Sequence, residues 1–147
     1  MRVRRDESGS ALVEFALLMP VLVLILVGMV NYTAETVYSI QVQEGANAGA
    51  EYGAIPGYES SLSAIQTYTV ALMPYLSGAT ATANNIWSCT AGGASVPSTT
   101  ICSGGGTPYK YVVVTTQATV HRLLSYPGFP STVTLNGYAS IQVPWSN

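Results

Sequence analysis

The chain has 147 residues, of which only 8% are charged, and its formal net charge is −2. Beyond residue 35 the basic side chains, apart from His121, are Lys110 and Arg122 alone, whereas a phosphate-binding surface needs several cations, so this composition argues against a nucleic-acid partner. The many Tyr, Val, Ile and Leu residues argue against disorder and predict one small folded domain beyond an N-terminal apolar segment.

An uncharged apolar run from residue 15 to 34 is long enough to cross a bilayer. At a rise of about 1.5 Å per residue, these roughly 20 residues span about 30 Å of hydrocarbon. Lys and Arg are retained on the cytoplasmic side, so the arginines before the run predict that the N-terminus lies inside and the C-terminal part outside. Those arginines are Arg2, Arg4 and Arg5. A cleaved secretory signal peptide is the alternative, but its apolar core would be shorter, about 7 to 15 residues. We therefore expect a basic leader over residues 1–9, a transmembrane helix over 10–34 and an extracytoplasmic domain over 35–147.

One carboxylate, Glu14, lies at the start of the apolar run. An acid inside an apolar membrane helix costs a few kcal/mol and usually has a partner. Glu14 either stays hydrated at the cytoplasmic interface or pairs with a positive group. A cut after Gly9 would supply such a group, because it would leave a new α-amino group on Ser10, one helical turn from Glu14.

Residues 11–20 read Ala-Leu-Val-Glu-Phe-Ala-Leu-Leu-Met-Pro and follow a glycine and a basic leader. This stretch resembles the processing region of TadE-like pseudopilins of tight-adherence (Flp) pilus systems, which have a type IV pilin-like N-terminus. The resemblance implies that a prepilin peptidase, itself an aspartate protease, cuts between Gly9 and Ser10. It also implies that Glu14 and Phe15 serve recognition and assembly, and that other pilin or pilus-assembly subunits are partners. The implied location is the bacterial inner membrane, which the chain crosses once. Incorporation into a surface pilus is one possible outcome.

Residues 31–54 should continue the same helix outside the membrane, since no proline interrupts them before Pro56. Three glycines recur there every four residues, which places them on one helical face: Gly45, Gly49 and Gly53. Glycine costs about 1 kcal/mol in an exposed helix, so this face predicts the close approach of another element. The partner is either this chain's own sheet or a helix of another subunit. TadE-like proteins often have Gly-Ala-Arg near this point, whereas this chain has Gly-Ala-Glu at residues 49–51, which puts the role of that arginine in doubt.

Beyond Pro56 the sequence predicts a second helix and three strands. The helix should run from about residue 60 to 76, with one mostly apolar stripe that packs in the core: Leu62, Ile65, Thr69, Leu72 and Leu76. Alternation of apolar and polar residues then predicts strands at about 80–90, 109–123 and 132–143, the last two with one buried face each.

The expected fold class is therefore α+β. A transmembrane helix continues into a long outer helix, followed by a second, shorter helix and a small antiparallel three-stranded sheet. In the loop between the last two strands, Tyr126 and Phe129 either anchor the loop or present an apolar contact.

Two cysteines, Cys89 and Cys102, lie on the predicted outer side. In an oxidising compartment two nearby cysteines usually pair, and a bridge closing a loop of this size stabilises by about 3 kcal/mol in the chain-entropy treatment. The alternatives are two free thiols or a metal site. A metal ion would need two more ligands, and His121 is the only one at hand, so we expect a disulfide and no metal site.

The sequence offers no catalytic arrangement. A Ser-His-Asp triad would have to use His121, the only histidine, and no aspartate follows Asp6. The outer carboxylates lie seven to nine residues apart, which provides no close pair for acid–base chemistry: Glu35, Glu44, Glu51 and Glu59.

We therefore expect a non-enzyme with no cofactor and no small-molecule substrate. The resemblance implies a membrane-anchored minor pilin or pseudopilin that acts in assembly of a tight-adherence pilus or secretion apparatus. The first alternative is an uncleaved bitopic envelope protein with an extracytoplasmic binding domain. A weaker one is a domain secreted after removal of a signal peptide.

Overall fold

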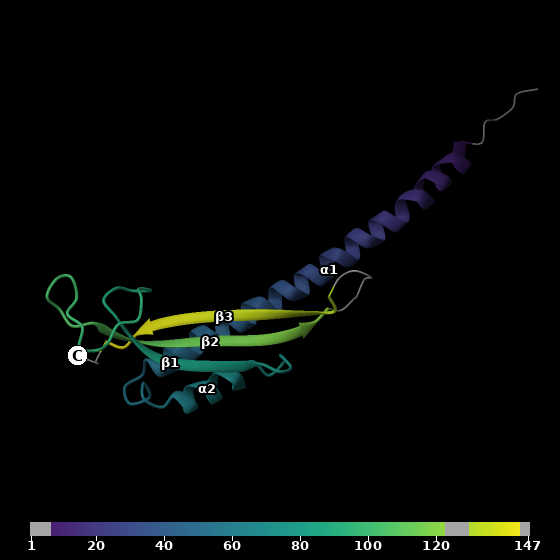
Figure 1. Cartoon of the computed structure of the whole chain (residues 1–147). Helices are drawn as coiled ribbons and strands as arrows, with labels where there is room; N and C mark the ends of the chain where they lie inside the picture. The colour runs from purple at the N-terminus through teal and green to yellow at the C-terminus, as the bar shows by residue number, and fades with distance from the viewer. Residues whose placement is uncertain (1–6, 123–129, 145–147) are drawn as a thin grey trace, which may run out of the picture.

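The computed structural model describes residues 7–122 and 130–144. The elements in chain order are α1 (Glu7–Gly53), α2 (Leu62–Ala71), β1 (Thr80–Ser88), β2 (Tyr109–His121) and β3 (Thr132–Gln142). The first half of α1 projects away alone, and its second half packs with α2 and the sheet into one folded domain, here called the outer domain after the orientation predicted from the sequence (Figure 1). The predicted α+β architecture, with one long helix, one short helix and a three-stranded antiparallel sheet, is confirmed.

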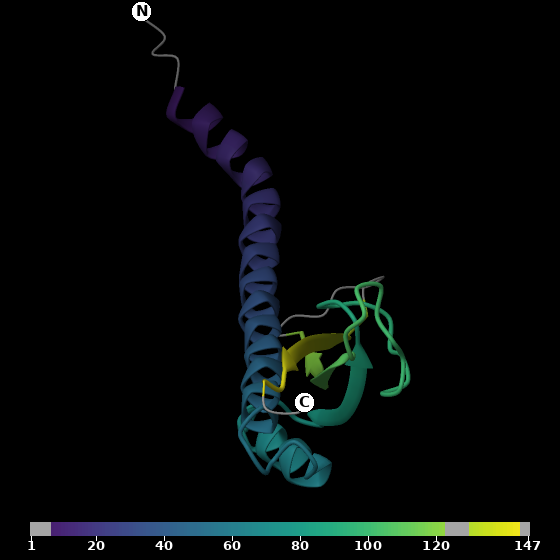
Figure 2. The same ribbon diagram turned by 90° about the vertical axis from the view of Figure 1, so that its left-hand side faces the viewer.

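Helix α1 runs for 47 residues without a break. Its length is about 70 Å at the usual rise. Its most apolar window has a mean hydropathy of 2.6, is long enough to cross a membrane, and is not covered by any other part of the described chain. Pro20 lies inside the helix and has no N–H to donate to the carbonyl four residues earlier. The N-terminal part of α1 leans away from the axis of the rest (Figure 2).

The three strands form one sheet in the order β1-β2-β3, with both neighbouring pairs antiparallel. In the register, Ala83 of β1 and Ala139 of β3 both lie opposite Val114 of β2. One face of β2 is buried, as the alternation predicted: Val112, Val114, Thr116, Ala118 and Val120. The loop with Tyr126 and Phe129, and the predicted end of β2 at residue 123, lie outside the described residues.

The core lies between this sheet face and the two helices. α1 contributes three fully buried residues, Val42, Ala46 and Ala50, at a spacing of four that forms one stripe. They pack with residues from α2 and all three strands, in two adjoining clusters that include Ile65, Met73, Leu76, Ala83, Val112, Val114, Ala118, Val120, Ala139 and Val143.

Helix α2 is shorter than the sequence predicted. It ends at Ala71, and turns replace the expected last helical turns up to residue 76. Pro74 explains the difference, because proline lacks the N–H that continues a helix and disfavours the helical conformation in the residue before it. Leu72, which was expected in the buried stripe, is therefore exposed, whereas Met73 and Leu76 reach the core from the turns.

Candidate functional site

The residues of the predicted processing and assembly region all lie on the first turns of α1: Gly9, Ser10, Glu14 and Phe15. Each is exposed, and a Cβ added at Gly9 would meet no atom within 4 Å. Nothing else in the described chain covers this end of the helix. The region is therefore free to meet a protease, lipid or another subunit.

Ser10 and Glu14 lie four residues apart on this helix. Residues at this spacing are neighbours on a helix surface, with Cβ atoms about 5–6 Å apart. An α-amino group created at Ser10 would therefore start within reach of the Glu14 carboxylate.

The three glycines of the repeated spacing lie where α1 meets α2. A Cβ at Gly45 would lie 2.9 Å from the sulfur of Met73, and a Cβ at Gly49 would overlap the side chain of Thr69. At Gly53 it would lie 2.7 Å from side-chain atoms of both Ile65 and Val112.

The partners of these glycines, Ile65 and Thr69 on α2 and Met73 in the turn after it, also recur every four residues but in the reverse order. The α2 segment therefore runs antiparallel to α1, and its side chains fit between the turns of α1. The element that approaches the glycines is thus mainly the chain's own second helix, with Val112 of the sheet at the end of the row. The sequence had left the choice between the sheet and a helix of another subunit.

A second close approach joins α1 to the sheet. The buried Thr116 hydroxyl donates a hydrogen bond of 2.8 Å to the backbone carbonyl of Val42. Across the sheet, Gly137 lies opposite Thr116, and a Cβ there would lie 2.6 Å from the same Val42 oxygen. This contact was not predicted from the sequence, where its one signal is a glycine in the middle of a strand, which often marks a close backbone approach.

Gln43 of α1 binds the backbone of β3. Its side-chain Nε2 donates to the Tyr138 carbonyl at 2.7 Å, and its Oε1 accepts from the Tyr138 N–H at 3.2 Å. β3 is an edge strand, and unpaired edges invite pairing with other chains. The amide of Gln43 occupies the free edge of β3 at this point and fixes α1 beside it.

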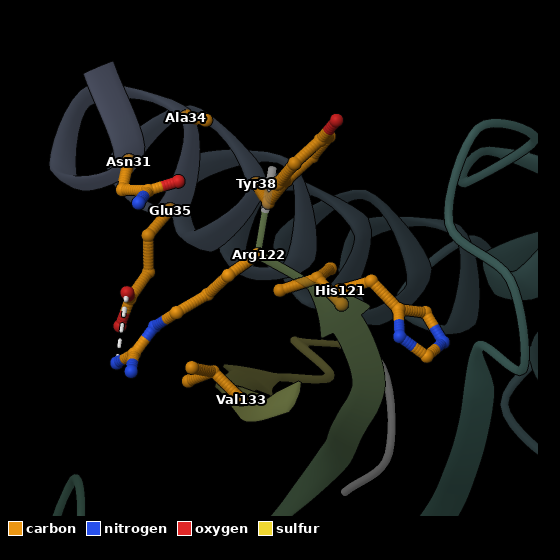
Figure 3. A pocket seen from close by; sticks show the side chains of 8 residues that line it. Asn31, Ala34, Glu35, Tyr38, His121, Arg122 and Val133 are labelled. Carbon is orange, nitrogen blue, oxygen red and sulfur yellow. Dashed lines mark ion pairs between the residues drawn. The ribbon is translucent and has the colours of Figure 1, made fainter. Parts of the chain in front are cut away.

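The end of the outer domain nearest the membrane helix carries an ion pair. Arg122, directly after β2, has its Nη2 3.6 Å from Oε2 of Glu35 on α1 (Figure 3). The same guanidinium donates from Nη1 to the carbonyl of Pro130 at 3.2 Å, which places it between α1 and the start of β3. His121 points away from this pair and is exposed, as expected for a residue at a strand end.

The opposite end of the domain carries the disulfide. Cys89 and Cys102 are bonded, with their Cα atoms 5.6 Å apart, and they close the loop between β1 and β2. A backbone bridge from Val96 to Trp87 folds this loop back onto the end of β1. Beside the disulfide lies an open hollow of about 390 Å³, lined mainly by Gly, Ser and Thr residues of the loop and by Tyr109.

Three tyrosines lie at the corner where α1 turns into α2. Tyr52 stacks on Tyr68 with ring centroids 4.4 Å apart and also contacts Tyr58 at 4.7 Å. Desolvation raises the pKa of the Tyr52 phenol above its ordinary value, and the neighbouring Tyr58 and Tyr68 raise it further. The cluster therefore favours neutral rings and fixes the corner through stacking.

Within the described residues, no three His, Cys, Asp or Glu side chains gather as they would around a metal ion. The described residues present an exposed apolar helix with Glu14 at its start, and a small domain held to the second half of the same helix.

Residues 9–51 match the family model described as TadE-like protein. The match covers the predicted processing region, the membrane-length run and the first two glycines of the α2 contact, and it confirms the resemblance predicted from the sequence. No match was found among curated proteins or among solved structures.

Proposed function

We propose, starting from the TadE-like match over residues 9–51, that this chain is a membrane-anchored minor pilin or pseudopilin that acts in assembly of a tight-adherence pilus or secretion apparatus. The match itself indicates a pseudopilin-type, structural protein associated with such a pilus. The observation that carries the finer proposal is that one uninterrupted helix bears the Gly9–Ser10 and Glu14 motif at one end and the outer domain at the other.

The proposed mechanism has three steps. A prepilin peptidase cuts the Gly9–Ser10 bond on the cytoplasmic side of the inner membrane. The Glu14 carboxylate then offsets the charge of the new Ser10 amine, which lowers the cost of holding either group at the edge of the hydrocarbon. Finally, membrane helices bundle, and the outer domains contact their neighbours.

The packing of the second half of α1 supports assembly through the first half of this helix. The Gly45, Gly49 and Gly53 face is filled by α2 and the sheet, so it is not available to another subunit. The longest uncovered apolar stretch of α1 is in its first half. Lateral assembly through the membrane helix leaves the folded outer domain intact.

The test is substitution of Glu14 in the full chain, expressed with an active prepilin peptidase. Glu14→Ala should sharply reduce incorporation into the assembled apparatus while the thermal unfolding of the outer domain stays the same, because Glu14 contacts nothing in that domain. Glu44→Ala, which removes an exposed acid from the outer part of the same helix, is the matched control and should incorporate normally. Normal assembly with Glu14→Ala would contradict the proposed role.

The mature N-terminus separates this proposal from the alternatives. Intact mass and N-terminal sequencing should find a chain beginning at Ser10 only when the peptidase is active. A chain that still begins at Met1 would favour an uncleaved bitopic binding protein. A start near residue 35 would favour a secreted domain.

A further inference from the structure

The contacts of α1 show which end of the outer domain is closest to the membrane. The first residues of α1 to meet the domain are Asn31, Ala34, Glu35 and Tyr38, and they meet the end of β2 and the start of β3. The charge-free run ends at Ala34. Tyr38 lies one helical turn farther, about 6 Å along the axis, whereas the headgroup layer beyond the hydrocarbon is roughly 5–7 Å deep. On this spacing, the contacts between α1 and the domain begin near the end of the charge-free run and extend over a distance equal to the depth of a headgroup layer.

A hollow of about 170 Å³ opens at this level. It is lined by Tyr38, by the turn after α2 and by the last residues of β2: Tyr75, Leu76, Ser77, Thr119, Val120 and His121. Its polar groups are phenol and aliphatic hydroxyls and one imidazole, all of which can donate to a phosphate oxygen. The hollow thus offers hydrogen-bond donors at the depth where lipid phosphates lie.

Tyr75 and Tyr32 stand out at the same end of the domain. Among the large apolar and aromatic side chains that the structure describes, Tyr75 has the greatest exposure, 84%, and Tyr32 on α1 is 75% exposed. Tyrosine is enriched at membrane–water interfaces because its ring is apolar and its hydroxyl is polar. Exposure in water leaves such a ring unpacked, whereas the headgroup layer covers it.

The charges at this level suit a lipid surface. Glu35 would repel anionic headgroups, but it is paired with Arg122. The next acid along α1 is Glu44, about 15 Å beyond Ala34. The surface made by Tyr38, Tyr75, Thr119, His121 and Arg122, here called the membrane-proximal rim, therefore carries no uncompensated negative charge.

We propose that the membrane-proximal rim rests in the headgroup layer of the bilayer that α1 crosses, and that the hollow between Tyr38, Tyr75 and His121 receives a phospholipid headgroup. The inference rests on the membrane anchoring in the proposed function. The covalent continuity of α1 from the span into the rim identifies the occupant as the membrane of the same chain.

The test uses nitroxide labels on the full chain in vesicles of phosphatidylcholine and phosphatidylglycerol. Both native cysteines are in the disulfide, so one introduced cysteine takes one label. The probe is Tyr75→Cys. The matched control is Tyr138→Cys, an exposed tyrosine whose backbone lies beside Gln43, about 13 Å beyond Ala34. A label at Leu24→Cys, inside the apolar run, reports whether this part of α1 is embedded in the membrane.

We expect the label at residue 75 to broaden the ³¹P resonance of the lipid phosphates and to lose accessibility to a water-soluble nickel chelate, and the label at residue 138 to do neither. The label at residue 24 should be shielded from the chelate. If residues 75 and 138 behave alike while residue 24 is shielded, the rim proposal is overturned and the anchor stands. If residue 24 is open to the chelate, the anchor itself fails, and the rim proposal fails with it.

Discussion

Gly49 is where a single added methyl group would disturb the contact between α1 and α2 most. Its missing Cβ leaves the space that Thr69 fills, and Thr69 is buried with its hydroxyl bonded to the Ile65 carbonyl at 2.7 Å. The Thr69 side chain therefore cannot turn away without losing that bond.

We predict that Gly49→Ala destabilises the outer domain. Alanine favours a helix over glycine by about 1 kcal/mol, but overpacking a close contact costs about 1–3 kcal/mol, and the second effect should prevail. The measurement is thermal unfolding followed by near-ultraviolet circular dichroism. Gly28→Ala is the matched control, because a Cβ there meets no atom within 4 Å, and it should not lower the melting temperature. An unchanged melting temperature for Gly49→Ala would mean that α2 can shift to accommodate a methyl group.

Some of these contacts were predictable from the sequence, and others were not, for a physical reason. The spacing of the three glycines is a local signal, and it correctly indicated a close approach although it did not identify α2 as the main partner. The Glu35–Arg122 pair and the Thr116–Val42 bond join residues far apart in the chain. No local pattern encodes such pairs, because they depend on how the sheet lies against the helix.

The elements were more predictable than their ends. The alternation in β2 and β3 predicted both faces, since the sheet has one side against the helices. The outer face is nevertheless buried at Tyr111 and Val113, near the start of β2, which a strict two-sided pattern did not anticipate. For α2, the apolar stripe extended to residue 76, but the helix stops at Ala71, because Pro74 has no N–H with which to continue it.

The disulfide holds the loop at one end of the sheet, so its loss should destabilise that end most. We predict that Cys89→Ser together with Cys102→Ser lowers the stability of the outer domain by about 3 kcal/mol, the chain-entropy value for a loop of this size. Hydrogen exchange should rise in residues 90–101 and at the end of β1, while the Thr116–Val42 contact region keeps its protection. A reductant should destabilise the native chain and leave the double variant unchanged; equal sensitivity of both proteins would contradict this assignment.

At the scale of the whole molecule, α1 is the one element shared by the apolar segment and the outer domain. An unbroken helix fixes the orientation of the domain relative to the span, which a flexible connection would not do. We predict that a Gly-Gly-Ser insertion after Tyr32 changes the melting temperature of the outer domain little, because it separates only Asn31 from the α1 residues that contact the domain. The insertion should reduce assembly, because the domain can then rotate freely on its anchor.

The control for that insertion is the same three residues placed after Ala91, in the exposed loop closed by the disulfide. Assembly should survive there. Normal assembly with the insertion after Tyr32 would show that the orientation of the domain does not matter for its incorporation.

The strands and α2 lie alongside the second half of α1 over much of its length, from the level of Glu35 to that of Gly53. A pull along the axis of α1 would therefore load the Glu35–Arg122 pair, the Thr116 hydrogen bond, the Gln43 amide and the glycine row together, in shear. Contacts loaded in parallel share a force, whereas contacts loaded in series break one after another. If the membrane helix is held while the outer domain is pulled, these contacts therefore share the load, and the fold resists tension along the axis of α1.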